Sequence, residues 1–216
     1  MVKESSHDEK ERFKHSIELA TTIIIALATV ASAWCAYQAT LWGGIQIFQL
    51  SAMNALGRKG SEQTIYAGQM RMMDGILFIE YIKAKKRHED FLADFFYHRF
   101  RPELKRATDA WLATKPFQNP QAPPHPLVME EYSPASEQEA KRLSEESAQK
   151  LEDARQANQN SDNYIMLTVL FASVMFFGGI STQLETPRYR ITLLAIGALV
   201  LCAALGVLGT YPITLE

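Results

Sequence analysis

The chain has 216 residues and a formal net charge of −2 at pH 7. Without an excess of basic residues it lacks the charge of a typical nucleic-acid-binding protein, so we expect no nucleic-acid partner. Its mean hydropathy of −0.12 is that of an ordinary soluble protein. That average is misleading, because the apolar residues are concentrated in three blocks.

The first apolar block follows a mixed-charge amino-terminal tail, residues 1–16, and covers residues 17–42. It has no charged residue between Glu18 and Arg58. About 20 apolar residues suffice for a helix to cross a hydrocarbon core of about 30 Å, so the block predicts a first transmembrane helix. Alternatively, residues 31–33 (Ala-Ser-Ala) form a signal-peptidase site. The long tail and the continuation of the apolar run to Trp42 argue against cleavage.

Trp34, Gln38 and Trp42 fall at intervals of four and share one face of this helix. The simplest interpretation is an aromatic belt at the level of the lipid headgroups. Alternatively, Gln38 donates a hydrogen bond to another helix, an interaction worth about 1 kcal/mol in membranes. A third interpretation is that the face lines a pore.

Residues 43–161 form a water-facing segment that is helical almost throughout. The first membrane helix continues into it, and Gly57 and Gly60 predict a break. Beyond them, apolar residues with helical spacing define one face. A denser aromatic run follows, in which we expect Phe95 and Phe96 to be core residues, and Pro102 breaks or starts a helix. The members of the apolar face are Ile65, Met72, Ile76, Ile79 and Ile82.

Six prolines between residues 115 and 134 predict a loop. It is longer than most connections, so it is ordered by packing or has a function. Residues 136–139 (Ser-Glu-Gln-Glu) match a capping box, after which a polar helix runs into the second apolar block. We expect the extensions of the first and second membrane helices to pack as a stalk, with a helical hairpin between them.

The second and third apolar blocks cover residues 162–184 and 191–213, and the short connection 185–190 joins them. Each is long enough to span a membrane. A soluble protein with three buried core helices of this length is disfavoured in so short a chain. The predicted fold class is therefore all-α, an integral membrane protein with three transmembrane helices and a helical water-facing segment between the first and second.

Basic residues flank the amino-terminal side of the first span and fill the short connection. By the positive-inside rule, both segments lie in the cytoplasm. The water-facing segment and the carboxyl terminus then lie outside it, in a multi-pass protein of the bacterial inner (plasma) membrane. The residues that carry this prediction are Lys10, Arg12, Lys14, Arg188 and Arg190.

Small residues recur at intervals of four in two spans, and such stripes allow close approach of helices in lipid. Ala28, Ser32 and Ala36 form the first stripe, which we assign to packing within one protomer. The second stripe is assigned to contact between protomers, with packing inside one protomer as the open alternative. It consists of Ala198, Cys202 and Gly206.

Few residues suggest chemistry. Asp90, Asp94 and His98 could present three metal ligands on one helix face, but a solvated helix edge is the simpler interpretation. Cys35 and Cys202 lie in apolar blocks and form no CxxC motif, which favours packing roles. No zinc-protease, phosphate-cradle or nucleophile-elbow motif occurs. We therefore expect no catalytic residues, no bound metal and no cofactor.

Several segments occur in the order found in a family of three-span bacterial membrane proteins, which this chain resembles. They include a WxxYQAxxW motif in the first span and an SDNY motif entering the second. The resemblance covers most of the chain from Trp34 onward, implies the same three-span layout and implies no activity. The segments are residues 34–43, 100–103, 109–112, 116–124, 161–164 and 169–173.

The leading functional prediction is a membrane-anchored helical interaction or scaffold protein, whose partners are the lipid bilayer and a second copy or another membrane protein. The alternative is a homo-oligomeric passive channel lined by Thr, Ser and Gln, since three helices alone enclose no useful pore. The spans lack the central ionisable groups that pumps and proton-coupled transporters need. An enzyme acting at the membrane surface is a more distant third possibility.

Overall fold

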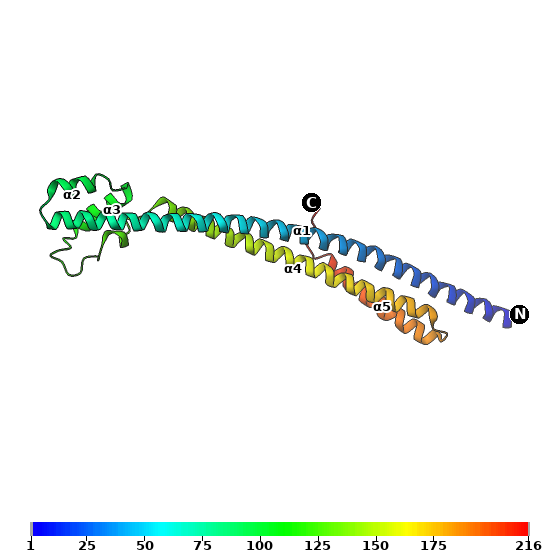
Figure 1. The fold of residues 1–216 in the computed structure, drawn as a ribbon. Coiled ribbons are helices and arrows are strands. Elements are labelled where there is room, and N and C mark those ends of the chain that lie inside the picture. The colour runs from blue at the N-terminus through cyan, green and yellow to red at the C-terminus, as the bar shows by residue number, and fades with distance from the viewer. Residues whose placement is uncertain (1, 216) are drawn as a thin grey trace. The chain divides into compact units, whose positions relative to one another are not determined.

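The computed structural model describes residues 2–215, with side chains from residue 11 onward. Within that range the chain is all-helical: α1 (Val2–Lys86), α2 (Asp90–Tyr97), α3 (Pro102–Ala113), a single 3-10 turn η1 (Pro126–Val128), α4 (Ala135–Gln183) and α5 (Pro187–Leu208) (Figure 1). Helices α1, α4 and α5 are each long and apolar enough to cross a membrane. The predicted all-α class with three membrane-spanning helices is confirmed, and it fits a multi-pass membrane protein.

The chain forms two compact units. The first unit contains Met1–Leu50 and Leu151–Glu216, and the second contains Ser51–Lys150. Each unit therefore holds a part of α1 and a part of α4, and α5 belongs to the first unit alone.

The core of the first unit is a three-helix seam. Its buried positions on α1 and α4 recur at intervals of three or four residues, the spacing that lets helices interlock along their length. Figure 1 shows α5 folded back beside α4, with which it shares this core. The seam consists of Ala28, Ala31, Cys35 and Ala39 of α1, Tyr164, Leu167, Phe171 and Val174 of α4, and Leu201 and Ala204 of α5.

Both ends of α5 follow from the sequence. Thr186 is the N-cap residue, and Pro187 occupies the first helical position, where its missing N–H costs nothing. Gly209 is the C-cap residue, and the chain then continues without helical structure through Leu215.

The second unit has a mixed aromatic core. The Phe78 and Trp111 rings meet edge to face at 5.2 Å, and the indole Nε1 of Trp111 donates a hydrogen bond to the carbonyl of Pro123 at 2.7 Å. That bond, with the burial of Pro126 and Pro134, holds the proline-rich segment against α3 by packing. The remaining core residues are Tyr81, Ala84, Ala93, Phe100, Leu104, Ala107 and Tyr132.

The expected break at Gly57 and Gly60 is wrong, because α1 continues through both. A Cβ on Gly60 would lie 3.5 Å from the Cβ of Leu143, and one on Gly57 would lie 3.6 Å from Ser147 Oγ. Two glycines therefore let α4 approach α1 closely. That contact offsets the cost of a glycine inside a helix, about 1 kcal/mol.

Two further expectations for the second unit are wrong. Phe95 is not a core residue: its side chain is 41% exposed, and Ala93 is the buried residue of α2. Eight residues give α2 only two turns, too few to bury every ring. The capping box is also absent, since α4 begins at Ala135 and Ser136 lies inside its first turn. Instead, the amide of Gln138 donates to the hydroxyl of Ser133 at 2.7 Å.

Candidate functional site

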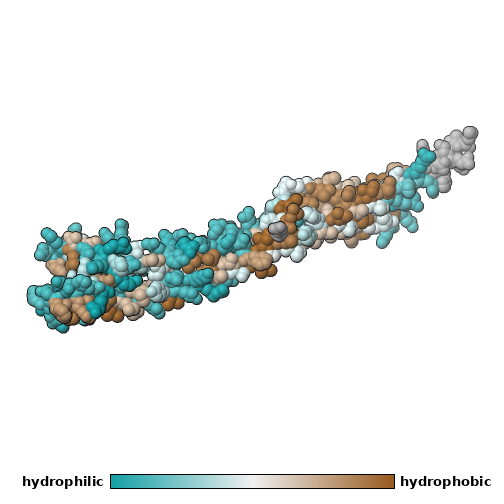
Figure 2. Space-filling view, turned by 90° about the horizontal axis from the view of Figure 1, so that it is seen from above, coloured by the Kyte–Doolittle hydropathy of each residue, from teal (hydrophilic) through white to brown (hydrophobic). Residues whose placement is uncertain are grey.

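The second unit carries an apolar face of α1 that the chain itself does not cover. We call Ile65, Met72, Ile76 and Ile79 the outer stripe; their exposed fractions are 62%, 67%, 56% and 51%. They are separated by seven, four and three residues, so they share one face. In Figure 2 this unit is mostly teal, with brown patches where apolar side chains reach the surface. These residues have the helical spacing noted from sequence, but they are not the buried face.

The buried face of α1 in this unit lies on the opposite side of the helix. Ala67, Asp74 and Tyr81 are seven residues apart and almost fully buried. A helix turns by about 100° per residue, so Ile76 lies about 200° around the axis from Asp74. The helix therefore has two faces of different composition, and only one of them is satisfied within the chain.

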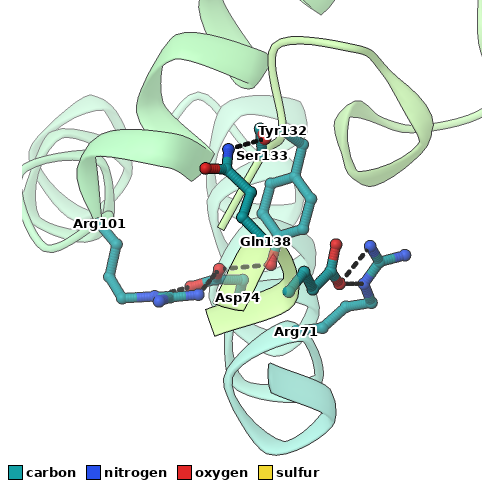
Figure 3. A network of polar contacts seen from close by, with 7 residues as sticks. Arg71, Asp74, Arg101, Tyr132, Ser133 and Gln138 are labelled. Carbon is teal, nitrogen blue, oxygen red and sulfur yellow. Dashed lines mark hydrogen bonds and ion pairs between the residues drawn. The ribbon is translucent and has the colours of Figure 1, made fainter. Parts of the chain in front are cut away.

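A half-buried ion pair holds the buried face of α1 in place, with Asp74 buried and Arg101 partly exposed. Arg101 donates from Nε to Oδ1 of Asp74 at 3.1 Å and from Nη2 to Oδ2 at 2.6 Å, and the Tyr132 hydroxyl donates to Oδ2 at 2.8 Å (Figure 3). Burial, and then the bond to Asp74, raise the pKa of Tyr132 above its ordinary value. The bond to Asp74 likewise raises the pKa of Arg101. Both carboxylate oxygens of Asp74 are thus occupied by the chain, which favours a structural role over a catalytic one.

A second, more exposed contact joins α1 to the start of α4. Arg71 donates from Nε and Nη2 to one oxygen of Glu137, at 3.0 and 2.6 Å, and its guanidinium lies 5.2 Å from the Tyr132 ring centre (Figure 3). Exposed ion pairs contribute little to stability. Together with the contacts of Asp74, the contact between Arg71 and Glu137 joins the covered side of α1 to the rest of the second unit and leaves the outer stripe uncovered.

In the first unit, Gln38 is fully buried. Its Nε2 donates to the carbonyl of Thr214 at 2.8 Å, and its Oε1 accepts from the Thr214 N–H at 3.1 Å. The partner is therefore the main chain of the segment after α5. The alternative interpretation from sequence, a hydrogen bond from Gln38 to another helix, is not what the structure shows. Trp42 Nε1 and the Tyr164 hydroxyl both donate to the carbonyl of Pro212, at 3.2 and 3.1 Å.

These contacts tie the segment after α5 to α1 and α4. Non-helical main chain leaves N–H and C=O groups unpaired, and in apolar surroundings each one is costly. The side-chain amide of Gln38 pairs with both the N–H and the C=O group of Thr214. Tyr164 was not singled out as a functional residue from sequence, because its partner is a carbonyl 48 residues away.

Trp34, the third member of the predicted face, is 36% exposed and packs near Tyr37, with ring centres 6.0 Å apart. Gln38 and Trp42 thus both donate hydrogen bonds to the segment after α5, at Thr214 and Pro212, whereas Trp34 packs near Tyr37. Hydroxyls of α4 that could line a pore donate to their own helix: Thr168 to Tyr164, Ser173 to Val169 and Ser181 to Gly178.

The first small-residue stripe is only partly in the core. Ala28 is buried, Ser32 is half-buried and Ala36 is exposed, so only Ala28 belongs to the core of the first unit. Residues four apart drift by about 40° per step around a helix. The seam on α1 instead contains an interval of three, from Ala28 to Ala31.

The second stripe behaves differently. Ala198 is half-buried, and Cys202 and Gly206 are exposed. The face of α5 that packs in the chain consists of Leu194, Gly197, Leu201 and Ala204. Contact between protomers through Ala198, Cys202 and Gly206 stays a prediction.

The candidate metal ligands are not gathered into one site. Nδ1 of His98 lies 3.3 Å from Oδ1 of Asp94, while Asp90 pairs with Lys85 at 3.5 Å. Within the residues the structure describes, no three His, Cys, Asp or Glu side chains are grouped to hold a metal ion. Cys35 is buried and Cys202 is exposed, and both are free thiols.

Comparisons of this chain with protein families, with curated proteins and with solved structures found no match.

Proposed function

We propose that this protein is a membrane-anchored scaffold whose second unit pairs with a second copy through the outer stripe of α1. The supporting observation is the stripe itself: four large apolar side chains, each more than half exposed, on a helix whose other face is buried. Exposed apolar patches on otherwise polar surfaces mark interaction sites. The predicted three-span layout, which the family resemblance also implies, supplies the anchor.

A second copy fits this stripe because of how membrane anchors constrain it. Two copies inserted in one bilayer have the same orientation, so their α1 helices run parallel and equivalent residues lie at the same depth. Spacings of four and three along the stripe suit such parallel pairing. A two-fold axis would then place each stripe against its own counterpart.

The flanks of the stripe also suit self-pairing. Tyr66, Gly68 and Met73 lie beside it, and none is charged. A Cβ added at Gly68 would have no atom within 4 Å, so two helices could approach closely there. Arg71, the nearest basic residue, already pairs with Glu137. Lys83, the charge that shares this face, lies beyond the end of the stripe and pairs with Glu80.

Cysteine crosslinking in native membranes tests the proposal. In a Cys35→Ala, Cys202→Ala background, Met72→Cys should form a disulfide-linked dimer under mild oxidation. Thr64→Cys is the matched control, since it is exposed on the same helix but off the stripe. It should give far less dimer. Ile76→Glu should shift the detergent-solubilised protein to a smaller species while helicity is unchanged.

Equal crosslinking at residues 64 and 72, or an unchanged size for Ile76→Glu, would contradict pairing through this face. If Ile76→Glu keeps its original size and neither Met72→Cys nor Thr64→Cys forms a crosslinked dimer, the contact between copies lies on another surface. The small residues Ala198, Cys202 and Gly206 of α5 would then become the leading alternative, tested by Ala198→Leu with Gly206→Leu.

We also propose that the protein lies in the bacterial inner membrane, with the amino terminus in the cytoplasm and the second unit outside it. The distribution of basic residues supports this orientation. A reporter enzyme that is active only outside the cytoplasm should be active when fused after Pro124 and silent when fused after Pro187. The opposite pattern would reverse the orientation.

A further inference from the structure

The first unit contains one buried cation with too few partners. Arg190, in the first turn of α5, is 8% exposed. Its Nη1 lies 3.7 Å from a Glu18 carboxylate oxygen, longer than a hydrogen bond, and its Nε has no hydrogen-bond partner among the described residues. A guanidinium carries five N–H donors, and leaving them unpaired away from water is costly. The position therefore calls for an additional anionic partner.

A cavity of about 1110 Å³ lies beside this guanidinium, between α1 and the connection from α4 to α5. Its wall has an apolar part, formed by Phe13, Ile17, Leu184 and Pro187, and a basic part formed by Lys14 and Arg190. The volume far exceeds that of a single small anion. A wall with one basic end and one apolar end matches a ligand that has an anionic group attached to an apolar body.

The main chain adds to the basic side of the cavity. Thr186 caps α5 without a side-chain hydrogen bond to the first turn, and Pro187 in that turn lines the cavity. The first N–H groups of a helix and its dipole favour anions, phosphate above all. Here that feature coincides with the buried Arg190, whose Nε has no hydrogen-bond partner among the described residues, so two independent features point to the same ligand chemistry.

Two carboxylates also line the cavity and reduce its attraction for an anion. Glu18 faces Arg190, and its side chain is 49% exposed, while Glu185 lies in the connection. With Lys14 and Arg190, the side-chain charges balance. Glu18 therefore competes with an incoming anion for Arg190, although its 3.7 Å separation makes it a weak competitor.

We propose that this cavity binds a phosphate-bearing anion, held by Arg190 with Lys14 and the start of α5. The chemistry fits the phosphodiester headgroup of an anionic phospholipid, whose acyl chain would lie along the apolar wall. Basic pockets between membrane helices bind such headgroups. A soluble phosphate would use the same donors and leave the apolar wall empty. The inference does not depend on pairing through the outer stripe, which belongs to the second unit.

The test uses the full chain in detergent with phosphatidylglycerol, phosphatidylcholine or inorganic phosphate as the probe. Retained adducts are measured by native mass spectrometry, and the shift in thermal unfolding is measured alongside. The wild type should retain phosphatidylglycerol in preference to phosphatidylcholine. Arg190→Gln should bind about tenfold more weakly or worse. Arg188→Gln, which removes an exposed charge two residues away, is the matched control and should bind as the wild type does.

Because Arg190→Gln could disturb the fold, Glu18→Gln provides a second arm. It removes the competing carboxylate and leaves Arg190 in place, so phosphatidylglycerol binding should strengthen. If inorganic phosphate gives the same shift and no lipid preference is seen, the site holds and its ligand is a soluble anion. Unchanged phosphatidylglycerol binding in both Arg190→Gln and Glu18→Gln would overturn the proposal.

Discussion

The two units use the same pair of helices, α1 and α4, but satisfy their buried polar groups in different ways. In the first unit, the buried Gln38 and Ser161 bond to main-chain groups, of Thr214 and Ala39 respectively. In the second unit, the buried polar group on α1 is an ionised side chain, Asp74, held by another ionised side chain, Arg101.

The contrast fits the surroundings that we propose for each unit, lipid for the first and water for the second. An amide or hydroxyl bonded to main chain leaves no net charge to place in lipid, where charge is costly. The Arg101 side chain remains 31% exposed, so the positive member of the ion pair in the second unit can be solvated by water. In the proposed arrangement, in which the second unit faces water, α1 buries a different kind of polar group on either side of the membrane surface. Arg190 is the exception in the first unit, which is why it suggests a missing partner.

Breaking the ion pair should have the largest effect, and should affect the second unit alone. Arg101→Leu leaves the Asp74 carboxylate buried without its cation, which should cost about 3–5 kcal/mol. Asp74→Asn should cost less, because Arg101 can turn to water. Unfolding can be followed by the fluorescence of Trp111 in a Trp34→Phe, Trp42→Phe background.

The control for that prediction is Arg142→Leu, which removes an exposed arginine that pairs with Glu139 and Glu146 on α4. Its stability should match that of the parent protein. If Arg101→Leu and Arg142→Leu behave alike, the buried network does not hold the second unit together.

Overpacking the seam should affect the first unit to a smaller extent. A Cβ at residue 178 would lie 2.7 Å from Cγ1 of Ile25, so Gly178→Ala should cost about 1–3 kcal/mol. The neighbouring Gly179→Ala meets open space and should be neutral or slightly stabilising. Opening is measured as the labelling rate of the buried Cys35 thiol in a Cys202→Ala background. Equal rates for the two alanines would show that α1 and α4 are not closely packed at this point.

Removing the amide that holds the segment after α5 should have a smaller effect still. Gln38→Leu should cost about 1 kcal/mol, the usual value for a polar contact between membrane segments. Thr40→Val is its control, because that hydroxyl bonds only to its own helix at Ala36. The Cys35 labelling rate should rise for Gln38→Leu and stay unchanged for Thr40→Val. A rise for both would point to a general loosening of α1.

The smallest effect is expected at the exposed ring of α2. Phe95→Ala should cost under about 1 kcal/mol, since the ring is 41% exposed and packs with Phe96 and Arg99. Phe100→Ala should cost about 3 kcal/mol or more, because Phe100 is buried. Trp111 fluorescence measures both. A large loss for Phe95→Ala would mean that another part of the protein covers the ring.

The presence of three long apolar helices could be predicted from sequence because a run of about 20 apolar residues is a local property. The end of the third could not: the predicted end is residue 213, and α5 ends at Leu208. The partners of Asp74 and Gln38 could not, since Arg101 and Thr214 lie 27 and 176 residues away and a lone Asp in sequence resembles any solvated residue. The break predicted at Gly57 and Gly60 was wrong for a related reason. Glycine lowers helix propensity locally, but the approach of Leu143 and Ser147 decides the outcome.

The apolar face of α1 shows the same limit. Helical spacing identifies Ile65, Met72, Ile76 and Ile79 as one face, but spacing does not tell whether the chain or a partner covers it. In the second unit, the face that the chain covers contains a charged residue, Asp74, whereas the face that carries the four large apolar side chains is the one left exposed.

The hydrogen bonds between Gln38 and Thr214 also constrain the order in which parts of the protein can form during synthesis. Gln38 enters the membrane with the first span, whereas the main-chain groups that satisfy its amide are made 176 residues later. Through that interval the amide has neither main-chain group of Thr214 to bond to. The first unit is therefore the earliest to begin forming and cannot be completed before the second unit has been translated.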